Sequence, residues 1–236
     1  MNRSRDKVRC ALNHQNAGSI PVDFGSTAVT GIHCRIVEAL RNYYGLAPRP
    51  VKIVDAFQML GEIDAELAEK IGVDCIGIGG PKDIFDLDTT RMHEQTTPWG
   101  QRVLVPEAMD LTPDMRGDVY VYAGGDQNYP PSAVMPKGCY FINAIERQQP
   151  IEEDRLDPED NVEEFGLLTE NDLAYYCAEA DKAYQTGRAV VASFGGTALG
   201  DVAFVPGMGL KQPKGIRSVV CLLYTSPSPR DRTRSR

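Results

Sequence analysis

The stretch IPVDFGSTAVTGIHCRIVEALRNYYG, residues 20–45, decides the fold class. Residues 20–24 (IPVDF) are typical of a short buried strand, and Gly25-Ser26 offers a turn and a helix N-cap. Apolar residues then recur at spacings of three and four, which predicts a helix over residues 27–44 that ends at Gly45. A strand followed directly by an amphipathic helix is the repeating unit of α/β proteins.

Further strand and helix patterns alternate along the chain. Buried-strand patterns occupy residues 51–54, 73–78 (VDCIGI) and 188–194 (RAVVASF). Helical patterns occupy residues 64–71 (DAELAEKI), ended by Gly72, and residues 170–186, begun by a capping box between Thr169 and Asp172. The continuous apolar run VDCIGI is typical of a parallel sheet covered on both faces. The alternation predicts an α/β protein with a largely parallel sheet.

The pattern changes to alternating apolar and polar residues between positions 91 and 145. Residues 96–106 (TTPWGQRVLVP) and 117–126 (GDVYVYAGGD) indicate two strands, joined by a hairpin loop over residues 114–117. We therefore expect an antiparallel β-hairpin insertion. The acidic residues 146–168 that follow indicate a surface loop.

Composition excludes several classes of protein. With 42% hydrophobic and 25% charged residues, the chain has the balance of a folded domain rather than of a disordered or coiled-coil protein. No run approaches the roughly 18 apolar residues of a membrane span, so we expect a cytoplasmic protein without a membrane partner. The 6 cysteines form no CxxC pair and are expected to be free thiols. A net charge of −8 argues against a nucleic-acid partner and favours a small-molecule substrate.

The last residues differ abruptly from the rest of the chain. Residues 221–231 (CLLYTSPSPRD) match the translation of a transposase-type sequencing adaptor, and we interpret residues 221–236 as a non-native read-through tail. A disordered basic tail is the alternative. The tail contributes +3, so residues 1–220 carry −11. We expect the natural protein to continue beyond Val220.

Several segments resemble the uroporphyrinogen decarboxylase superfamily, which unites haem-pathway decarboxylases and corrinoid-dependent methyltransferases on one (β/α)₈ TIM barrel. The segments are RDKVRCALNHQ (5–15), IPVDFG (20–25), LGEIDAELAEKIGVDCIGI (60–78), TTPWG (96–100), VLVP (103–106), MPKGCYF (135–141) and AVVASFGGTALGD (189–201). Their order and spacing carry the resemblance more than any one segment does. The resemblance implies that residues 1–220 are the N-terminal part of a single, incomplete barrel domain.

The chain departs from the decarboxylase branch at two places. That branch carries an arginine-rich segment after its first strand, whereas at this place the chain has DFGSTAVTGIH, and the first arginine after the predicted strand is Arg35. The branch's aspartate in an FSDI-like turn falls on Pro81 when counted from Asp74. The resemblance therefore favours the methyltransferase branch, which implies a zinc ion bound by a His-x-Cys pair and a later Cys, and a corrinoid partner. These metal ligands would lie beyond Val220.

Candidate site residues follow from position, because ligands of α/β barrels bind at the carboxyl ends of the strands. Asp23 and His33 are the catalytic candidates: Asp23 could orient a general acid, and His33 could donate a proton at the pocket rim. An aspartate at the start of a helix and a histidine on a helix surface are the ordinary alternatives. The expected substrate-binding residues are Ser26, Thr27, Gly79, Gly80, Gly195, Gly196, Thr197 and Asp201. Ser26 and Thr27 offer free amides to an anion, with simple capping as the alternative, and the glycines allow a ligand to approach the backbone.

These features lead to three alternative functions. The first is methyl transfer with zinc and a corrinoid partner. The second is decarboxylation of uroporphyrinogen or another small acid without a cofactor, in which Lys82 or Arg91 would replace the absent arginines. The third is a barrel without catalytic activity that binds a corrinoid protein or a tetrapyrrole.

Overall fold

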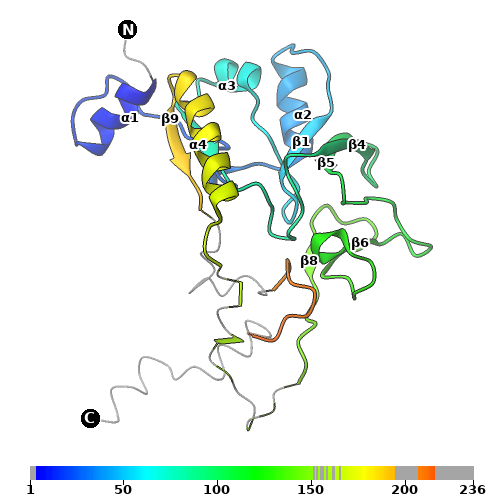
Figure 1. Cartoon of the computed structure of the whole chain (residues 1–236). Coiled ribbons are helices and arrows are strands. Elements are labelled where there is room, and N and C mark those ends of the chain that lie inside the picture. The colour runs from blue at the N-terminus through cyan, green and yellow to red at the C-terminus, as the bar shows by residue number, and fades with distance from the viewer. Residues whose placement is uncertain are drawn as a thin grey trace, which may run out of the picture.

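The computed structural model describes residues 4–150, 152, 154, 157, 159–160, 163–164, 166–194 and 207–215. They form an α/β protein, as the alternating sequence patterns predict (Figure 1). The helices are α1 (Ser4–Leu12), the 3₁₀ turn η1 (Ala28–Thr30), α2 (Cys34–Tyr43), α3 (Ala65–Ile71), the 3₁₀ turn η2 (Ala123–Gly125) and α4 (Glu170–Gln185). The strands are β1 (Val51–Asp55), β2 (Leu60–Gly61), β3 (Cys75–Ile78), β4 (Met92–Thr96), β5 (Arg102–Pro106), β6 (Val119–Val121), β7 (Ala133–Met135), β8 (Asn143–Ala144) and β9 (Ala189–Ala192).

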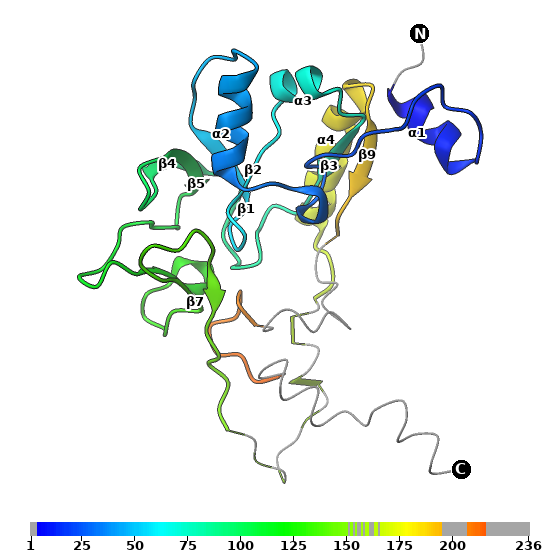
Figure 2. The ribbon, with the colours of Figure 1, turned by 180° about the vertical axis from the view of Figure 1, so that it is seen from behind.

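The strands form three separate sheets, with the orders β2-β1-β5-β4, β3-β9 and β6-β7-β8. β1 runs parallel to β5, and β3 runs parallel to β9 with Cys75 opposite Ala189 and Ile78 opposite Ala192. Helix α4 packs on β3 and β9, and α1 lies next to β9 (Figure 2). Within the described ranges the sheets do not close into a barrel, so the α/β class is confirmed and the barrel stays a prediction.

Capping signals predicted helix boundaries well. Asp64 caps α3 by accepting the amides of Glu66 and Leu67, and Gly72 ends the helix in the left-handed conformation, at φ 80°. Thr169 and the helical residue Asp172 form the expected capping box at the start of α4. The strands expected at residues 51–54, 73–78 and 188–194 are β1, β3 and β9.

The expected strand at residues 20–24 is not formed, because a side chain takes the place of a partner strand. The amide of Asp74 donates to the carbonyl of Val22 over 2.7 Å, and the amide of Val22 donates to Oδ2 of Asp74 over 2.8 Å. Lys7 of α1 pairs with the same carboxylate at 2.6 Å. The segment therefore runs beside the start of β3 in an extended conformation without a ladder of strand hydrogen bonds.

The helix expected over residues 27–44 begins later, at Cys34. Gly31 is extended, with ψ 166°, and separates η1 from α2. His33 is the N-cap of α2, and its ring nitrogen accepts the amide of Arg35. Val29, one of the apolar residues in the range predicted to be helical, is 93% exposed, whereas Val37 in the observed helix is 1% exposed.

The antiparallel insertion is present, but its strand pairing differs from the prediction. Strand β5 pairs with β4, with His93 opposite Val105, and not with β6. The connecting turn is closed by Thr97, whose amide donates to the carbonyl of Gln101 over 2.9 Å, with Gly100 at φ 85°. Residues 114–117 form a turn as expected, yet Asp114 closes it by binding nearby amides and no strand pair is joined there.

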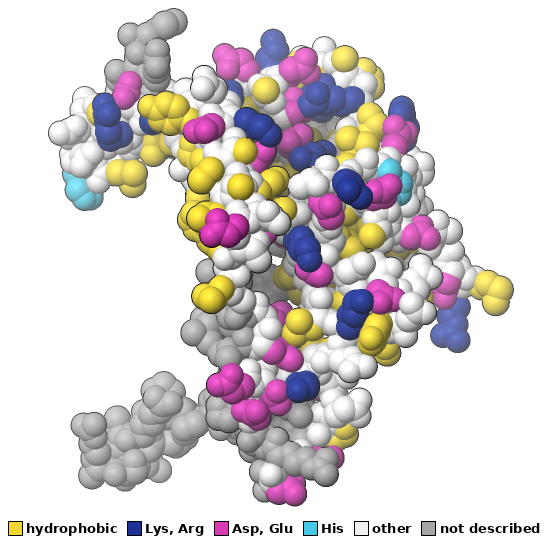
Figure 3. All heavy atoms as spheres, viewed as in Figure 1, with side chains coloured by type: hydrophobic (Ala, Val, Ile, Leu, Met, Phe, Trp, Pro, Cys, Tyr) yellow, Lys and Arg dark blue, Asp and Glu magenta, His cyan; other side chains and the backbone are white. Residues whose placement is uncertain are grey.

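One face around α4 and α1 remains apolar and open. On α4, Tyr176 is buried, whereas Leu173 is 52% and Tyr184 62% exposed. Figure 3 shows hydrophobic side chains gathered over this part of the surface. Strand β9 has one hydrogen-bonded neighbour, β3, within the described residues, so its other edge is unpaired there.

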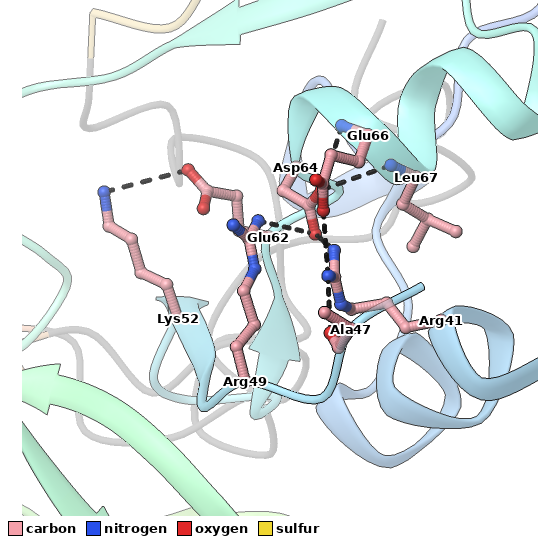
Figure 4. Close-up of polar contacts among 8 residues, drawn as sticks. All are labelled: Arg41, Ala47, Arg49, Lys52, Glu62, Asp64, Glu66 and Leu67. Carbon is pink, nitrogen blue, oxygen red and sulfur yellow. Dashed lines mark hydrogen bonds and ion pairs between the residues drawn. The ribbon is translucent and has the colours of Figure 1, made fainter. Parts of the chain in front are cut away.

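A buried ion cluster joins α2, the start of β1 and α3 (Figure 4). Arg41, 3% exposed, donates to Asp64, to Glu66 at 3.0 Å and to the carbonyl of Ala47 at 2.8 Å. Asp64 also pairs with Arg49 at 2.8 Å. Burial alone would raise the pKa of Asp64, but hydrogen bonds from the backbone and from both guanidinium groups hold it below its usual value.

Replacement of Arg41 by methionine tests this cluster. The substitution leaves Asp64 buried with one cation fewer, so we expect the free energy of unfolding to fall by about 3 kcal/mol. Arg102→Met is the matched control, because Arg102 pairs with Glu94 in an exposed cross-strand contact and should matter far less. Urea denaturation followed by circular dichroism measures both variants. Equal losses would contradict the structural role given to Arg41.

Candidate functional site

A cavity of about 610 Å³ lies between β1 and β3. Three segments reach it in succession: residues 24–28, the carboxyl end of β1 at Asp55, and Gly79 and Gly80 directly after β3. These are the segments that follow the first three strand-like stretches of the sequence. Their convergence on one cavity is the arrangement expected where strand ends form a binding site.

Four of the expected substrate-binding residues line this cavity, namely Ser26, Thr27, Gly79 and Gly80. The loop that carries the first two packs tightly on β3. A Cβ atom at Gly77 would lie 1.6 Å from the carbonyl oxygen of Ser26, so only glycine fits at this position. At Gly79 a Cβ would meet no atom within 4 Å. The backbone there is therefore open to a ligand.

Asp23 braces the loop beside the cavity. The hydroxyl of Ser26 donates to its Oδ2 over 2.7 Å, and the hydroxyl of Thr30 lies 3.4 Å from its Oδ1. Asp23 is exposed and is not among the residues that line the cavity. Its observed role is to fix the turn that presents Ser26, and its catalytic role stays a prediction.

His33 lies in an aromatic cluster and not at the cavity. Its ring centroid is 5.5 Å from that of Trp99 and 5.3 Å from that of Phe141. Nδ1 accepts the amide of Arg35 over 3.2 Å, and Nε2 lies 3.0 Å from the carbonyl oxygen of Tyr140. With Nδ1 as the acceptor, Nε2 is the ring nitrogen that can donate to Tyr140. The structure gives His33 a capping role, and its catalytic role stays a prediction.

The remaining expected site residues fall outside the described ranges. These are Gly195, Gly196, Thr197 and Asp201, and the metal ligands expected beyond Val220. Within the described ranges, no group of three His, Cys, Asp or Glu side chains could hold a metal ion, and the 5 described cysteines are free thiols. The described residues therefore do not supply a zinc site.

Two acidic residues that sequence reasoning missed stand out by their burial. Asp55 ends β1, lines the cavity and accepts the amide of Gln58 over 2.8 Å, and burial raises its pKa. Asp83 follows β3; its Oδ1 accepts the amides of Phe85 and Leu87 over 2.9 and 3.0 Å. Its Oδ2 is buried without a hydrogen-bond partner among the described residues.

The electrostatic setting of Asp83 is unusual for a carboxyl group. Burial, and to a lesser degree the neighbouring carboxylates of Asp55 and Asp86, raise its pKa to about 6. Lys82 is adjacent in sequence and lines the cavity, but its ammonium group pairs with Asp86 at 2.6 Å. Arg91, the other proposed substitute for the absent arginines, lies 3.9 Å from Asp88 and is not a lining residue.

One sequence signal could have identified Asp55. It stands at the end of the strand VKIVD, as Asp23 stands near the end of IPVDF, and strand ends are where functional side chains gather. Asp83 lies in PKDIFDLD, which has the composition of an ordinary turn. Its burial depends on tertiary packing and leaves no local signal.

Comparisons with protein-family models, with curated proteins and with solved structures found no significant match. The family resemblance therefore rests on the sequence segments alone. In the described part of the chain, no helix combines the length and the apolar character that crossing a bilayer requires.

Asp83 predicts a pH dependence of stability that can be measured. Because its pKa is raised on folding, the folded state binds more protons than the unfolded state between about pH 4 and pH 6. Stability should fall as pH rises through this range. We expect the unfolding free energy of the wild type, relative to Asp83→Asn, to fall by about 2 kcal/mol between pH 4 and pH 7.

Urea denaturation at several pH values provides this measurement. Asp110→Asn is the control, because Asp110 is exposed and its removal should leave the pH profile of the wild type unchanged. Parallel profiles for the wild type and Asp83→Asn would show that Asp83 titrates alike in the folded and unfolded states.

Proposed function

We propose that this chain is part of a cytoplasmic uroporphyrinogen decarboxylase-superfamily enzyme, built on a (β/α)₈ barrel, that binds a small-molecule substrate in the cavity between β1 and β3. Corrinoid-dependent methyl transfer is the reaction proposed first. The observation that carries the proposal is the convergence of residues 24–28, Asp55 and Gly79–Gly80 on one cavity. These are the positions where a barrel of this superfamily would bind its substrate.

The part of the reaction that the described residues support is substrate binding. The exposed backbone at Gly79, next to Gly80 in the cavity wall, lets a flat or bulky group approach closely. Asp55 offers a carboxyl group that could accept a hydrogen bond from an N–H or O–H group of the substrate. In the methyltransferase branch a zinc ion would activate a thiol. The described residues supply no zinc site, so this part of the reaction would depend on residues outside the described ranges.

Decarboxylation is the second candidate, favoured by the raised pKa values of Asp55 and Asp83. When a carboxylate leaves as carbon dioxide, the electrons of the broken C–C bond stay on the neighbouring carbon, which then takes a proton. A carboxyl group whose pKa is raised by burial, as that of Asp55 is, keeps its proton more readily and can deliver it to that carbon. Asp55 lines the cavity and is therefore the donor in this candidate reaction.

Two assays separate these reactions. On the protein expressed from its native reading frame across Val220, methyl transfer predicts bound zinc and demethylation of a methylated corrinoid in the presence of a thiol. Decarboxylation predicts carbon dioxide release from uroporphyrinogen without added metal. Binding of a corrinoid or tetrapyrrole without either product would leave the non-catalytic alternative, and the lack of any binding would overturn the proposal.

Gly79→Leu tests the cavity itself. The backbone at Gly79 is outside the left-handed region and its Cβ direction is open, so leucine should fit without strain and occupy the binding space. We expect substrate binding to weaken at least tenfold while the melting temperature stays within about 2 °C. Gly166→Leu is the matched control, since Gly166 is exposed with equally open space. Unchanged binding by Gly79→Leu would place the substrate elsewhere.

A further inference from the structure

Residues 207–215 (GMGLKQPKG) form a strap, and one arginine binds the part of it from residue 207 to residue 211. Arg147, which follows β8, donates from Nη2 to the carbonyl of Gly207 over 2.6 Å. From Nη1 it donates to the carbonyls of Leu210 and Lys211 over 2.8 and 3.3 Å. Figures 1 and 2 show the strap in orange near the sheet of β6, β7 and β8. One planar guanidinium group thus fixes three carbonyl groups of a single short segment.

The strap rests on the turn that contains Asp83. Met208 is 2% exposed and joins the same buried cluster as Phe85. A Cβ at Gly209 would lie 3.1 Å from the carbonyl oxygen of Ile84 and 3.3 Å from the amide nitrogen of Asp86, so the strap backbone packs directly on this turn. The second fastening is an ion pair at 2.6 Å between Lys211 of the strap and Asp126.

The turn under the strap is the one that Asp83 organises. The carboxylate of Asp83 accepts two amides of the turn, and the amide of Asp86 donates to the carbonyl of Asp83 over 3.0 Å. Any displacement of Ile84 to Asp86 therefore alters the surroundings of the Asp83 carboxyl group. The strap buries the side chains of Met208 and Pro213, and the carboxylate of Glu163 accepts the amides of Lys214 and Gly215. A short segment held mainly by hydrogen bonds and ion pairs is typical of parts of a protein that open locally at low cost.

We propose that Arg147 is a positioning residue, which latches the strap onto the turn of residues 83–87 and thereby keeps the carboxyl group of Asp83 buried. The use of that carboxyl group in a reaction rests on the proposed function, whereas the latch is tested without turnover. The carboxylates that face Asp83 are Asp55 at the end of β1 and Asp86 in its own turn. Neither contacts Arg147 in a hydrogen bond, so removal of Arg147 acts on Asp83 through the strap.

The test compares Arg147→Ala with Arg116→Ala, in which an exposed arginine of a surface turn is removed. We expect trypsin to cleave after Lys211 and Lys214 at least tenfold faster in Arg147→Ala, as identified by mass spectrometry. We also expect the pKa of Asp83, followed by the NMR shift of its carboxyl carbon, to fall from about 6 toward the ordinary aspartate value of about 4. Arg116→Ala should change neither quantity.

Arg147→Lys guards against simple unfolding, because lysine keeps the charge and the aliphatic stem but cannot contact all three carbonyls at once. We expect it to show an intermediate acceleration of cleavage and a smaller fall in the pKa of Asp83. Faster cleavage with an unchanged pKa of Asp83 would overturn the proposal, as would unchanged cleavage in both Arg147 variants. If cleavage and the pKa of Asp83 respond as expected but the protein binds no substrate, the result would count against the proposed function alone.

Discussion

The carboxylate of Asp74 is the contact on which the arrangement of the site depends. It accepts the amide of Val22 and the ammonium group of Lys7, while the backbone of Asp74 binds Val22 and, through its carbonyl, Ala189 at the start of β9. Burial would raise the pKa of Asp74, but the hydrogen bonds from Lys7 and Val22 hold it below its usual value. One residue, 4% exposed, thus joins α1, the loop before η1, β3 and β9 through its side chain and its backbone. Because the chain after Val22 must then run along β3, Ser26 meets Gly77 and the cavity wall is formed.

Acidic residues near the starts of β1 and β3 have a different electrostatic environment from those near the ends of the same strands. Asp64 and Asp74, near the starts of β1 and β3, are paired with cations, and the pKa of each is lowered. Asp55 and Asp83, at or after the ends of the same strands, have no cation partner among the described residues, and the pKa of each is raised. The first pair stabilises the ionised form and so the fold, whereas the second pair is costly to ionise. Carboxyl groups whose pKa values are perturbed in this way are common at functional sites.

The success of sequence reasoning depended on whether a signal was local. The caps of α3 and α4 are made by residues close to the helix ends, namely Asp64 and Gly72 for α3 and Thr169 and Asp172 for α4. The boundaries of these two helices were therefore predicted closely. The strand expected at residues 20–24 failed because its hydrogen-bond partner is the side chain of Asp74, about fifty residues away. No periodicity can reveal such a contact.

The candidate site shows the same division. Ser26, Thr27, Gly79 and Gly80 line one cavity, and their positions after strands could be located from sequence, whereas their role in substrate binding stays a prediction. The raised pKa of Asp83 arises from burial beneath a turn, and the strap fastened by Arg147 comes from more than 120 residues further along the chain. Burial of this kind is a property of the assembled fold. The sequence pattern could therefore identify the four residues that line the cavity, but it could not identify Asp83 as a buried acid.

The sheet pairing explains why the cavity lies between β1 and β3. The chain adds β5 to β1 and β9 to β3, so each of the two strands extends its own sheet and neither hydrogen bonds to the other. A barrel of the proposed kind would continue from the edge of β9 that has no strand partner among the described residues. The exposed apolar side chains of Val190 on β9 and of Leu173 and Tyr184 on α4 would be covered by a further strand and helix. The barrel proposal thus accounts for an open strand edge and for exposed apolar side chains, both of which are unfavourable in water.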